Sequence, residues 1–255
     1  MSHTTPCTGC QEGAPFPVDF TMAFQPIVDV RTKRVWAYEA LVRGTGGEGA
    51  GAVLAAVTAD NRYKFDQACR VKAIEMAGNG LPSGSDARLS INFMPNAVYE
   101  PTACIRASLA AARRVNFDPQ KLMFEFTENE QIADTAHVRN IIAEYRRMGF
   151  ATALDDFGAG YAGLGLLAQF QPDIIKIDIE LVRGIDTSSA RQAIVAGILV
   201  ICQNLGIQVL AEGVETAREA QTLLSAGVTL QQGYYYAKPE IATFISGEDV
   251  FARLQ

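Results

Sequence analysis

The stretch ATALDDFGAGYAGLGLLAQFQPDIIKID (Ala151–Asp178) contains the repeating unit that decides the fold. Within it we predict a strand over Ala151–Asp156, a short helix near Leu164–Phe170 and a second strand over Asp173–Asp178. Two strands joined through a helix form a crossover unit, in which the strands run parallel. This stretch therefore predicts an α/β fold with a mostly parallel sheet.

The same alternation extends to both sides of this unit. Eight strands are predicted in all, and six of them alternate with helices. In a chain of 255 residues this number favours closure into a (β/α)8 barrel of the TIM type, whose usual length is about 250 residues. A doubly wound open sheet is the alternative that the pattern leaves open. The predicted strands are Met22–Val30, Val35–Val42, Arg88–Asn92, Leu122–Glu128, Ala151–Asp156, Asp173–Asp178, Ile207–Glu212 and Val228–Gln232.

Turns and helix ends support these boundaries. The first two strands flank Arg31–Arg34, which predicts a hairpin and hence an antiparallel first strand. Thr216 and Glu219 predict a capping box for a helix that ends at Gly227. The other predicted helices are Ala50–Ala59, Asp66–Ala77, Thr102–Arg114, a helix capped by Asp134 that ends at Gly149, one from Thr187–Ser189 to Gly206, and a C-terminal helix.

The first 19 residues are predicted to form a flexible tail, and residues 20–255 the barrel. The tail is rich in Thr, Pro, Gly and Cys and has no periodicity. Cys7 and Cys10 form a CxxC pair, which is half of a zinc site or a redox pair. No second such pair follows, so we favour two incidental cysteines over a zinc site shared between two chains.

Composition excludes several classes of function. The net charge of −6 argues against binding of polymeric nucleic acid. The longest apolar run, Ala193–Cys202, is shorter than a membrane span, and the first residues do not form a signal peptide. We therefore expect a soluble cytoplasmic protein without a membrane partner. The only two histidines, His3 and His137, exclude a zinc site built from imidazoles.

Seven predicted strands each end in or near a polar side chain. One such residue is usually a solvated rim residue, and one lysine in a strand usually extends its ammonium to water. Seven together are harder to explain in this way, because active sites of such barrels lie at the carboxyl ends of the strands. The oxygen ligands favour Mg²⁺ or Mn²⁺, and two adjacent aspartates suggest two ions. The polar residues are Glu39, Asn92, Glu125, Asp155, Asp156, Lys176, Glu212 and Gln232.

Seven motifs in order resemble the EAL-domain family of cyclic di-GMP phosphodiesterases. The resemblance spans roughly Phe20 to Phe244 and is carried by FQPIVD (Phe24–Asp29), AYEALVRG (Ala37–Gly44), FEFTE (Phe124–Glu128), DDFGAGYAGL (Asp155–Leu164), IKID (Ile175–Asp178), AEGVET (Ala211–Thr216) and QGYYYAKP (Gln232–Pro239).

The resemblance implies a role for each matching residue. Asp155 would be shared by the two metals: Glu39, Asn92, Glu125 and Asp155 would hold one, and Asp155, Asp156 and Glu212 the second. Lys176 would orient the attacking water. Glu39 and Glu212, like Lys176, would be catalytic residues. Lys176, with a pKa lowered by the metals, and Glu212 remain rival candidates for the base. On the substrate side would lie Gln25, Arg43, Glu215 and Gln232, and Glu128 would anchor the loop Phe157–Gly163.

The implied function is hydrolysis of cyclic di-GMP to linear 5′-pGpG, in a homodimer, with Ca²⁺ as an inhibitor. The family often has two serines where Ala162-Gly163 stand, and no GGDEF string is present. Regulation would then come through the dimer, the tail, a separate protein, or not at all. One rival is a catalytically weak or inactive cyclic di-GMP receptor or protein-interaction module, which should lack metal ligands. Another is a barrel enzyme that stabilises carbanions with one Mg²⁺.

Overall fold

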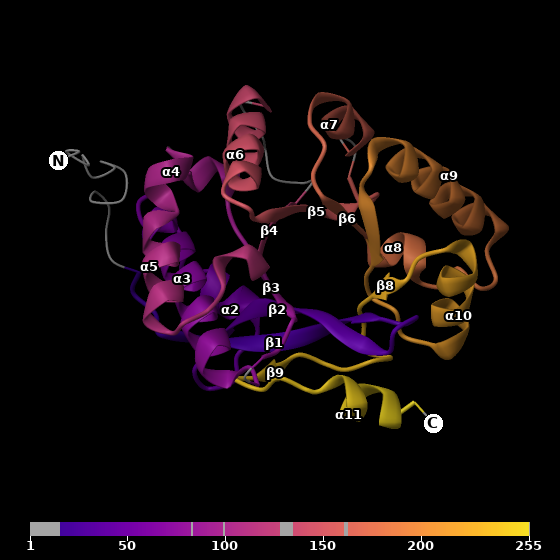
Figure 1. Cartoon of the computed structure of the whole chain (residues 1–255), viewed down its shortest axis with the longest axis horizontal. Helices are drawn as coiled ribbons and strands as arrows, with labels where there is room; N and C mark the ends of the chain where they lie inside the picture. Colours follow the sequence, from indigo (N-terminus) through magenta and orange to yellow (C-terminus); the bar gives the residue numbers. More distant parts are fainter. Residues whose placement is uncertain (1–15, 83, 99, 128–134, 161–162, 255) are drawn as a thin grey trace.

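The computed structural model describes residues 16–82, 84–98, 100–127, 135–160 and 163–254. Within these ranges eight strands form a closed ring, and helices surround it (Figure 1). The hydrogen-bonded order is β2-β3-β4-β5-β6-β7-β8-β1, and β1 also pairs with β2, which closes the ring. The strands are β1 (Phe20–Asp29), β2 (Arg34–Gly44), β3 (Arg88–Asn92), β4 (Leu122–Thr127), β5 (Ala151–Phe157), β6 (Ile174–Ile177), β7 (Gln208–Ala211) and β8 (Leu230–Gln231).

The first strand runs against both of its neighbours. β1 pairs antiparallel with β2 from Phe20 opposite Gly44 to Asp29 opposite Arg34, and antiparallel with β8 through Val28 and Gln231. The pairs from β2 to β8 are parallel. The predicted antiparallel first strand and the barrel are therefore confirmed, and the open sheet was the wrong alternative. A two-residue strand, β9 (Glu240–Ile241), also pairs with β1.

The helices cover the outside of the ring (Figure 1). The short elements β9 and α8 and two 3₁₀ turns were not predicted. The capping box of Thr216 and Glu219 is present, and Gly206 and Gly227 end their helices in the left-handed conformation, as predicted. The helices are α2 (Ala50–Leu54), α3 (Arg62–Gly80), α4 (Pro101–Cys104), α5 (Arg106–Arg114), α6 (Thr135–Arg147), α7 (Gly163–Gln169), α8 (Ile179–Val182), α9 (Ser189–Leu205), α10 (Ala217–Ala226) and α11 (Gly247–Ala252), with 3₁₀ turns at Pro95–Ala97 and Pro119–Lys121.

Three predicted helices differ in extent from the structure, and one of them, α3, is longer at both ends than the predicted Asp66–Ala77. α2 ends at Leu54, several residues before the predicted end, because the side chain of Asn61 folds the following segment into a turn. Its Oδ1 accepts the N–H of Thr58, and its Nδ2 donates to the carbonyl of Ala56. The helix predicted over Thr102–Arg114 is divided into α4 and α5 at Ile105.

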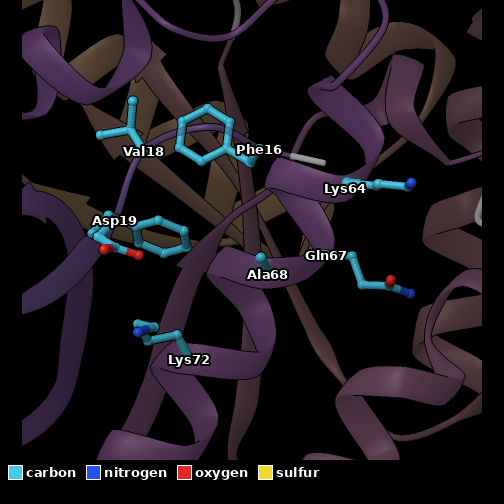
Figure 2. Close-up of a pocket in the computed structure, with 8 residues that line it drawn as sticks. Phe16, Val18, Asp19, Lys64, Gln67, Ala68 and Lys72 are labelled. Carbon is cyan, nitrogen blue, oxygen red and sulfur yellow. The ribbon is translucent and has the colours of Figure 1, made fainter. Parts of the chain in front are cut away.

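Only the last residues of the predicted tail are described. Phe16 packs against Phe65 on α3, with 4.5 Å between the ring centroids, and beside Phe20. Phe16 thereby lines a surface pocket of about 430 Å³, together with Lys64 and Lys72 of α3 (Figure 2). Residues 1–15, which include Cys7, Cys10 and His3, lie outside the described residues.

The barrel has two apolar layers. The larger one lies between the strands and the helices, where Phe24, Phe124 and Tyr145 are fully buried. The smaller one fills the inside of the ring with one residue from each of seven strands. Among the described helices, none is both long and apolar enough to cross a membrane. The inner residues are Ile27, Ala37, Met123, Ala153, Ile174, Leu210 and Leu230.

Candidate metal centre and active site

A polar layer lies directly above the inner apolar layer. Side chains two residues apart on a strand lie on the same face of the sheet. The residue two positions away from each inner apolar residue therefore also points into the barrel. On the parallel strands these residues lie towards the carboxyl end, and on the antiparallel β1 the order is reversed. β3 contributes Ser90 and Asn92. The polar members from the other strands are Gln25, Glu39, Glu125, Asp155, Lys176, Glu212 and Gln232.

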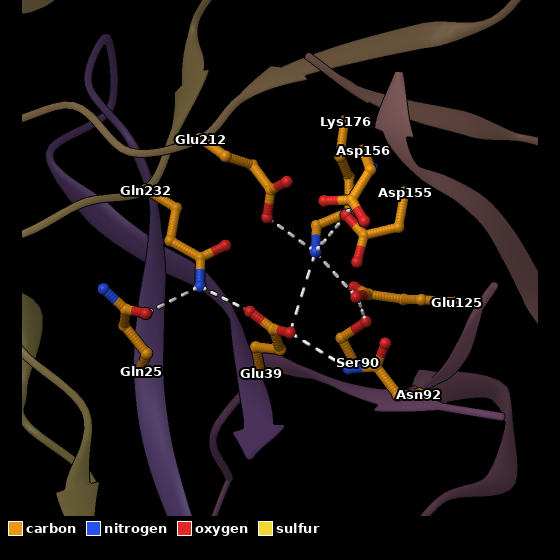
Figure 3. A network of polar contacts seen from close by, with 10 residues as sticks. All are labelled: Gln25, Glu39, Ser90, Asn92, Glu125, Asp155, Asp156, Lys176, Glu212 and Gln232. Atoms are coloured by element: carbon orange, nitrogen blue, oxygen red, sulfur yellow. Dashed lines mark hydrogen bonds and ion pairs between the residues drawn. The ribbon is translucent and has the colours of Figure 1, made fainter. Parts of the chain in front are cut away.

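Lys176 is the centre of this layer (Figure 3). Its Nζ lies 2.7 Å from Glu125 Oε2, 2.7 Å from Glu212 Oε1, 3.0 Å from Asp155 Oδ1 and 3.7 Å from Glu39 Oε1. The side chains of Lys176 and Glu125 are completely buried. A buried ammonium is stable only when opposite charges surround it, and these four carboxylates supply them.

The carboxylates outnumber the one ammonium among them. Burial raises the pKa of Glu125 to about 8, despite the opposing effect of Lys176. Burial and the charges of Asp155 and Asp178 raise the pKa of Asp156 to about 6. Both shifts mean that protons, or other cations, are needed to compensate these side chains.

The pKa values of Glu212 and Asp155 are shifted in opposite directions. Burial raises the pKa of Glu212 well above its usual value, and the neighbouring Asp155 adds to the shift. Burial also opposes ionisation of Asp155, but Lys176 and the hydrogen bonds that Asp155 receives hold its pKa below the usual value. Although burial lowers the pKa of Lys176, the carboxylates around it raise that pKa well above its ordinary value. The protein groups alone therefore keep Lys176 protonated.

The carboxylates fall into two groups that could each hold a divalent ion. Oxygens of Glu39, Glu125 and Asp155 lie within 4.8 Å of one another, and so do oxygens of Asp155, Asp156 and Glu212. Asp155 belongs to both groups, which is the arrangement of a bridging ligand in a two-metal site. Hard oxygen donors and an excess of negative charge fit Mg²⁺ or Mn²⁺.

The backbone at the aspartate pair is unusual. Asp156 has a positive φ of 55°, a conformation that costs energy for a residue other than glycine. The N–H of Asp156 donates to Asp155 Oδ1 at 3.0 Å, which stabilises this turn. The register between β5 and β6 is irregular at the same place, between Leu154 and Phe157. The irregularity lets consecutive side chains both face the site.

Gln232 supports the site from the opposite side. Its Nε2 donates to Glu39 Oε2 at 2.7 Å and to Gln25 Oε1 at 3.2 Å, and Gln25 donates to the carbonyl of Ala237. The Oε1 of Gln232 is buried and has no hydrogen-bond partner among the described residues. A buried acceptor of this kind costs free energy unless a ligand or a water donates to it. It is therefore a candidate contact for a bound molecule.

Close backbone packing fixes the position of Gln232. Val214 donates its N–H to the carbonyl of Gln232, and Tyr235 donates to the carbonyl of Val214. Gly233 lies between them, and a Cβ there would come within 2.3 Å of the backbone nitrogen of Val214. Only glycine allows this approach.

The structure brings most of the predicted residues together and leaves some apart. Asn92 donates to Glu39 Oε1 at 3.1 Å at the mouth of the barrel. Arg43 instead donates to the carbonyl of Val42, and Glu215 pairs with Arg183 at 2.9 Å. Glu128 lies outside the described residues.

Ser90 was not predicted as part of the site. It is fully buried and donates to Glu125 Oε1. Its position two residues before Asn92 on the same strand is the signal that could have identified it.

The whole barrel resembles known proteins. The sequence matches the family described as EAL domain over residues 18–239. A solved structure described as a standalone versatile EAL protein from Vibrio cholerae O395, in its c-di-GMP bound form, is 51% identical with a TM-score of 0.86, and the alignment covers 90% of this chain and 96% of that one. Klebsiella pneumoniae BlrP1 in a calcium and cy-diGMP complex is 39% identical with a TM-score of 0.82, covering 89% of this chain and 57% of that one.

Curated relatives carry two kinds of description. The blue light- and temperature-regulated antirepressor BluF of Escherichia coli is 35% identical over 219 residues, which cover 86% of this chain and 54% of that protein. The cyclic di-GMP phosphodiesterase RocR of Pseudomonas aeruginosa is 31% identical over 156 residues, covering 61% of this chain and 40% of that protein. The chain thus spans about half, or less, of the length of these relatives.

Proposed function

The chain belongs to the EAL domain family, and on that premise we propose that it is a phosphodiesterase that hydrolyses cyclic di-GMP to linear 5′-pGpG. The observation that carries the proposal is the polar layer, in which Asp155 joins two carboxylate groups around one buried lysine. The Vibrio protein that resembles this chain over nearly its full length is described as bound to c-di-GMP.

Two divalent ions, Mg²⁺ or Mn²⁺, would activate water and neutralise the charge that develops on the phosphodiester. Glu39, Asn92, Glu125 and Asp155 would hold one ion. Asp155, Asp156 and Glu212 would hold the other, so that all six side chains serve as ligands. A BlrP1 structure with manganese and cy-diGMP is 38% identical to this chain and supports the pairing of such ions with this ligand.

The protein's own groups would position the reactants. Lys176, which the surrounding carboxylates keep protonated, would donate a hydrogen bond to the attacking water and orient it. Of the two candidates for the base, Glu212 is the better one because a protonated Lys176 has no lone pair with which to accept a proton.

The substrate would be recognised at the rim of the polar layer. The Oε1 of Gln232, for which the described residues offer no donor, would accept a hydrogen bond from the nucleotide, with Gln25 holding the amide in place. Arg43 and Glu215 would turn towards the substrate from their present partners, and Arg43 could then grip a phosphate oxygen. Glu128 would anchor the loop after β5.

A homodimer is part of the proposal, and α9 is its best surface. Residues 192–205 contain no charged side chain, and Ile194, Val200 and Leu205 are exposed by 49%, 58% and 42%. At the middle of this face, a Cβ added to Gly197 would meet no atom within 4 Å, so the fold of one chain does not require a glycine there. A glycine inside a helix destabilises it, and a close approach by a second helix explains its presence.

The pattern on this face fits a second copy of the same chain. The point midway between Ile194 and Ile201 along the helix lies next to Gly197. Two antiparallel copies of α9 would therefore place Ile194 of each against Ile201 of the other, as a two-fold interface requires. α9 lies at the outer edge of the molecule, where a partner can reach it (Figure 1).

Binding without turnover is the second candidate function. It is favoured by the description of BluF, a relative over most of this chain, as an antirepressor. The metal-binding carboxylates of the described site favour the enzyme, since a receptor does not need them.

One experiment separates the two functions. Purified protein is incubated with cyclic di-GMP and Mg²⁺, Mn²⁺, Ca²⁺ or EDTA, and the nucleotides are resolved by chromatography. Linear pGpG should appear with Mg²⁺ or Mn²⁺. Ca²⁺ should support binding but not turnover, because it is larger and prefers more ligands at longer distances. Binding without cleavage in every metal would favour the receptor, and full activity in EDTA would contradict the metal mechanism.

A further inference from the structure

A buried ion pair lies outside the polar layer, between the barrel and its helices. Arg70 Nη2 and Asp66 Oδ2, one turn apart on α3, are 2.7 Å apart, and both side chains are only 2% exposed. Such a pair is expensive to bury, and apolar side chains of similar volume would often stabilise a fold as well or better. Its presence therefore calls for a reason other than stability.

The other oxygen of Asp66 supplies that reason. Asp66 Oδ1 accepts the backbone N–H of Met94 at 2.9 Å. Met94 comes two residues after Asn92, where β3 has ended and no described strand offers this N–H an acceptor. The carboxylate of Asp66 replaces the missing strand partner, and its charge makes the hydrogen bond stronger than a neutral one.

The two residues before Met94 are also held, each by a different strand. Asn92 donates to Glu39 of β2, and Phe93 donates its N–H to the carbonyl of Glu125 of β4 at 2.9 Å. The ring of Phe93 packs on Tyr145 of α6, with 5.8 Å between centroids. The segment from Asn92 to Met94 thus connects the polar layer to α3.

We propose that Asp66 is a positioning residue of the metal site: held by Arg70, it fixes the backbone of Met94 and so the placement of Asn92 beside Glu39. The inference rests on the proposed metal-dependent function, but Asp66, Arg70 and Met94 are not among the proposed ligands of metal or substrate. Small displacements of a ligand weaken a metal site, and changes to residues behind the ligands typically cost about 10–100-fold in metal affinity or activity.

Two double variants separate the hydrogen bond from the charge. Asp66→Asn with Arg70→Met removes both charges but keeps an oxygen for the Met94 N–H. Asp66→Leu with Arg70→Met removes the charges and the acceptor. Neither leaves a buried charge without a partner, so both avoid the largest cost of breaking such a pair.

Two measurements are made without substrate. Mn²⁺ affinity is determined by calorimetry, and hydrogen exchange is followed at the Met94 amide in metal-free protein. The protein with Asp66→Asn and Arg70→Met, which keeps a neutral acceptor for the Met94 N–H, should lose less affinity than the protein with Asp66→Leu and Arg70→Met. The protein with Asp66→Leu and Arg70→Met should bind Mn²⁺ about 10–100-fold more weakly than wild type, and its Met94 amide should exchange faster. Glu75→Gln, which breaks the exposed pair of the same helix with Arg114, is the matched control and should change neither.

A single variant covers the case in which the protein with Asp66→Leu and Arg70→Met does not fold. Asp66→Glu keeps the charge but moves the acceptor by one methylene, and it should also weaken Mn²⁺ binding and speed the exchange at Met94. The inference would be overturned if the protein with Asp66→Leu and Arg70→Met had the Mn²⁺ affinity and the Met94 exchange rate of wild type. If only Asp66→Glu folds, the same result in that variant would overturn it. If wild-type protein binds Mn²⁺ but does not cleave cyclic di-GMP, the proposed function fails while this comparison still decides the role of Asp66.

Discussion

Lys176 donates to Glu125 at 2.7 Å, and both side chains are completely shielded from solvent. The two residues lie 51 positions apart in the sequence, on β6 and β4. Their contact places a positive charge at the centre of a ring of carboxylates and leaves a negative excess around it. This excess of negative charge explains why the site needs cations, and the experiments below on Asp155 and on pH depend on it.

The first prediction concerns the shared ligand. Asp155→Asn keeps the shape of the side chain but removes the charge that belongs to both carboxylate groups. Hydrolysis of cyclic di-GMP should fall by at least about 100-fold, the loss that even indirect changes to a metal site can cause. Steady-state kinetics with Mn²⁺ measure the effect. The exposed Asp60→Asn is the control, and equal rates in the two variants would rule out the bridging role.

The second prediction concerns pH. The pKa of Glu125 is raised to about 8 from its usual 4.5, so the folded metal-free protein binds a proton more tightly than the unfolded chain. The stabilisation by this proton is present at low pH and is lost as the pH rises through about 8. In EDTA, the free energy of unfolding should therefore fall between about pH 5 and pH 9, and Glu125→Gln should reduce the slope.

Urea denaturation at several pH values tests this, with the exposed Glu240→Gln as control. Mn²⁺ should restore stability at high pH, because it replaces the lost proton as the compensating charge. An identical pH slope in wild type and Glu125→Gln would show that this carboxyl does not titrate as proposed.

The third prediction concerns Gly233. A Cβ at this position would collide with the backbone of Val214, which cannot move as a side-chain end can. Gly233→Ala should cost about 1–3 kcal/mol of stability and raise the KM for the dinucleotide, because Gln232 is displaced. Gly165→Ala on α7 is the control, since nothing lies within 4 Å of its Cβ position. A variant as stable and active as wild type would show that the close approach does not matter.

The fourth prediction concerns the α9 face. Ile194→Glu with Ile201→Glu puts charges at the centre of the proposed interface, where burial would be costly. The variant should be monomeric in analytical ultracentrifugation at concentrations where wild type is dimeric. Leu54→Glu, an exposed apolar residue of α2, is the matched control and should not change the mass. A monomeric wild type would contradict the proposed dimer itself.

Local sequence patterns predicted the elements and the direction in which their side chains point. The alternation in β4 and β5 places Glu125 and Asp155 two residues beyond an inner apolar residue, and that spacing is visible in the sequence. The capping box at Thr216 and the glycines that end α9 and α10 were predictable for the same reason. Each of these signals depends on residues within one or two turns of each other.

Tertiary structure alone decided the contacts between distant segments. The closing of the ring by β1, the bond from Ser90 to Glu125 and the bond from Met94 to Asp66 join residues that no local period connects. The same is true of the pKa of Lys176, which depends on carboxylates on or next to other strands. Periodicity sets which face a side chain occupies, but only packing of the whole barrel sets its neighbours, because distances across the ring depend on every strand at once.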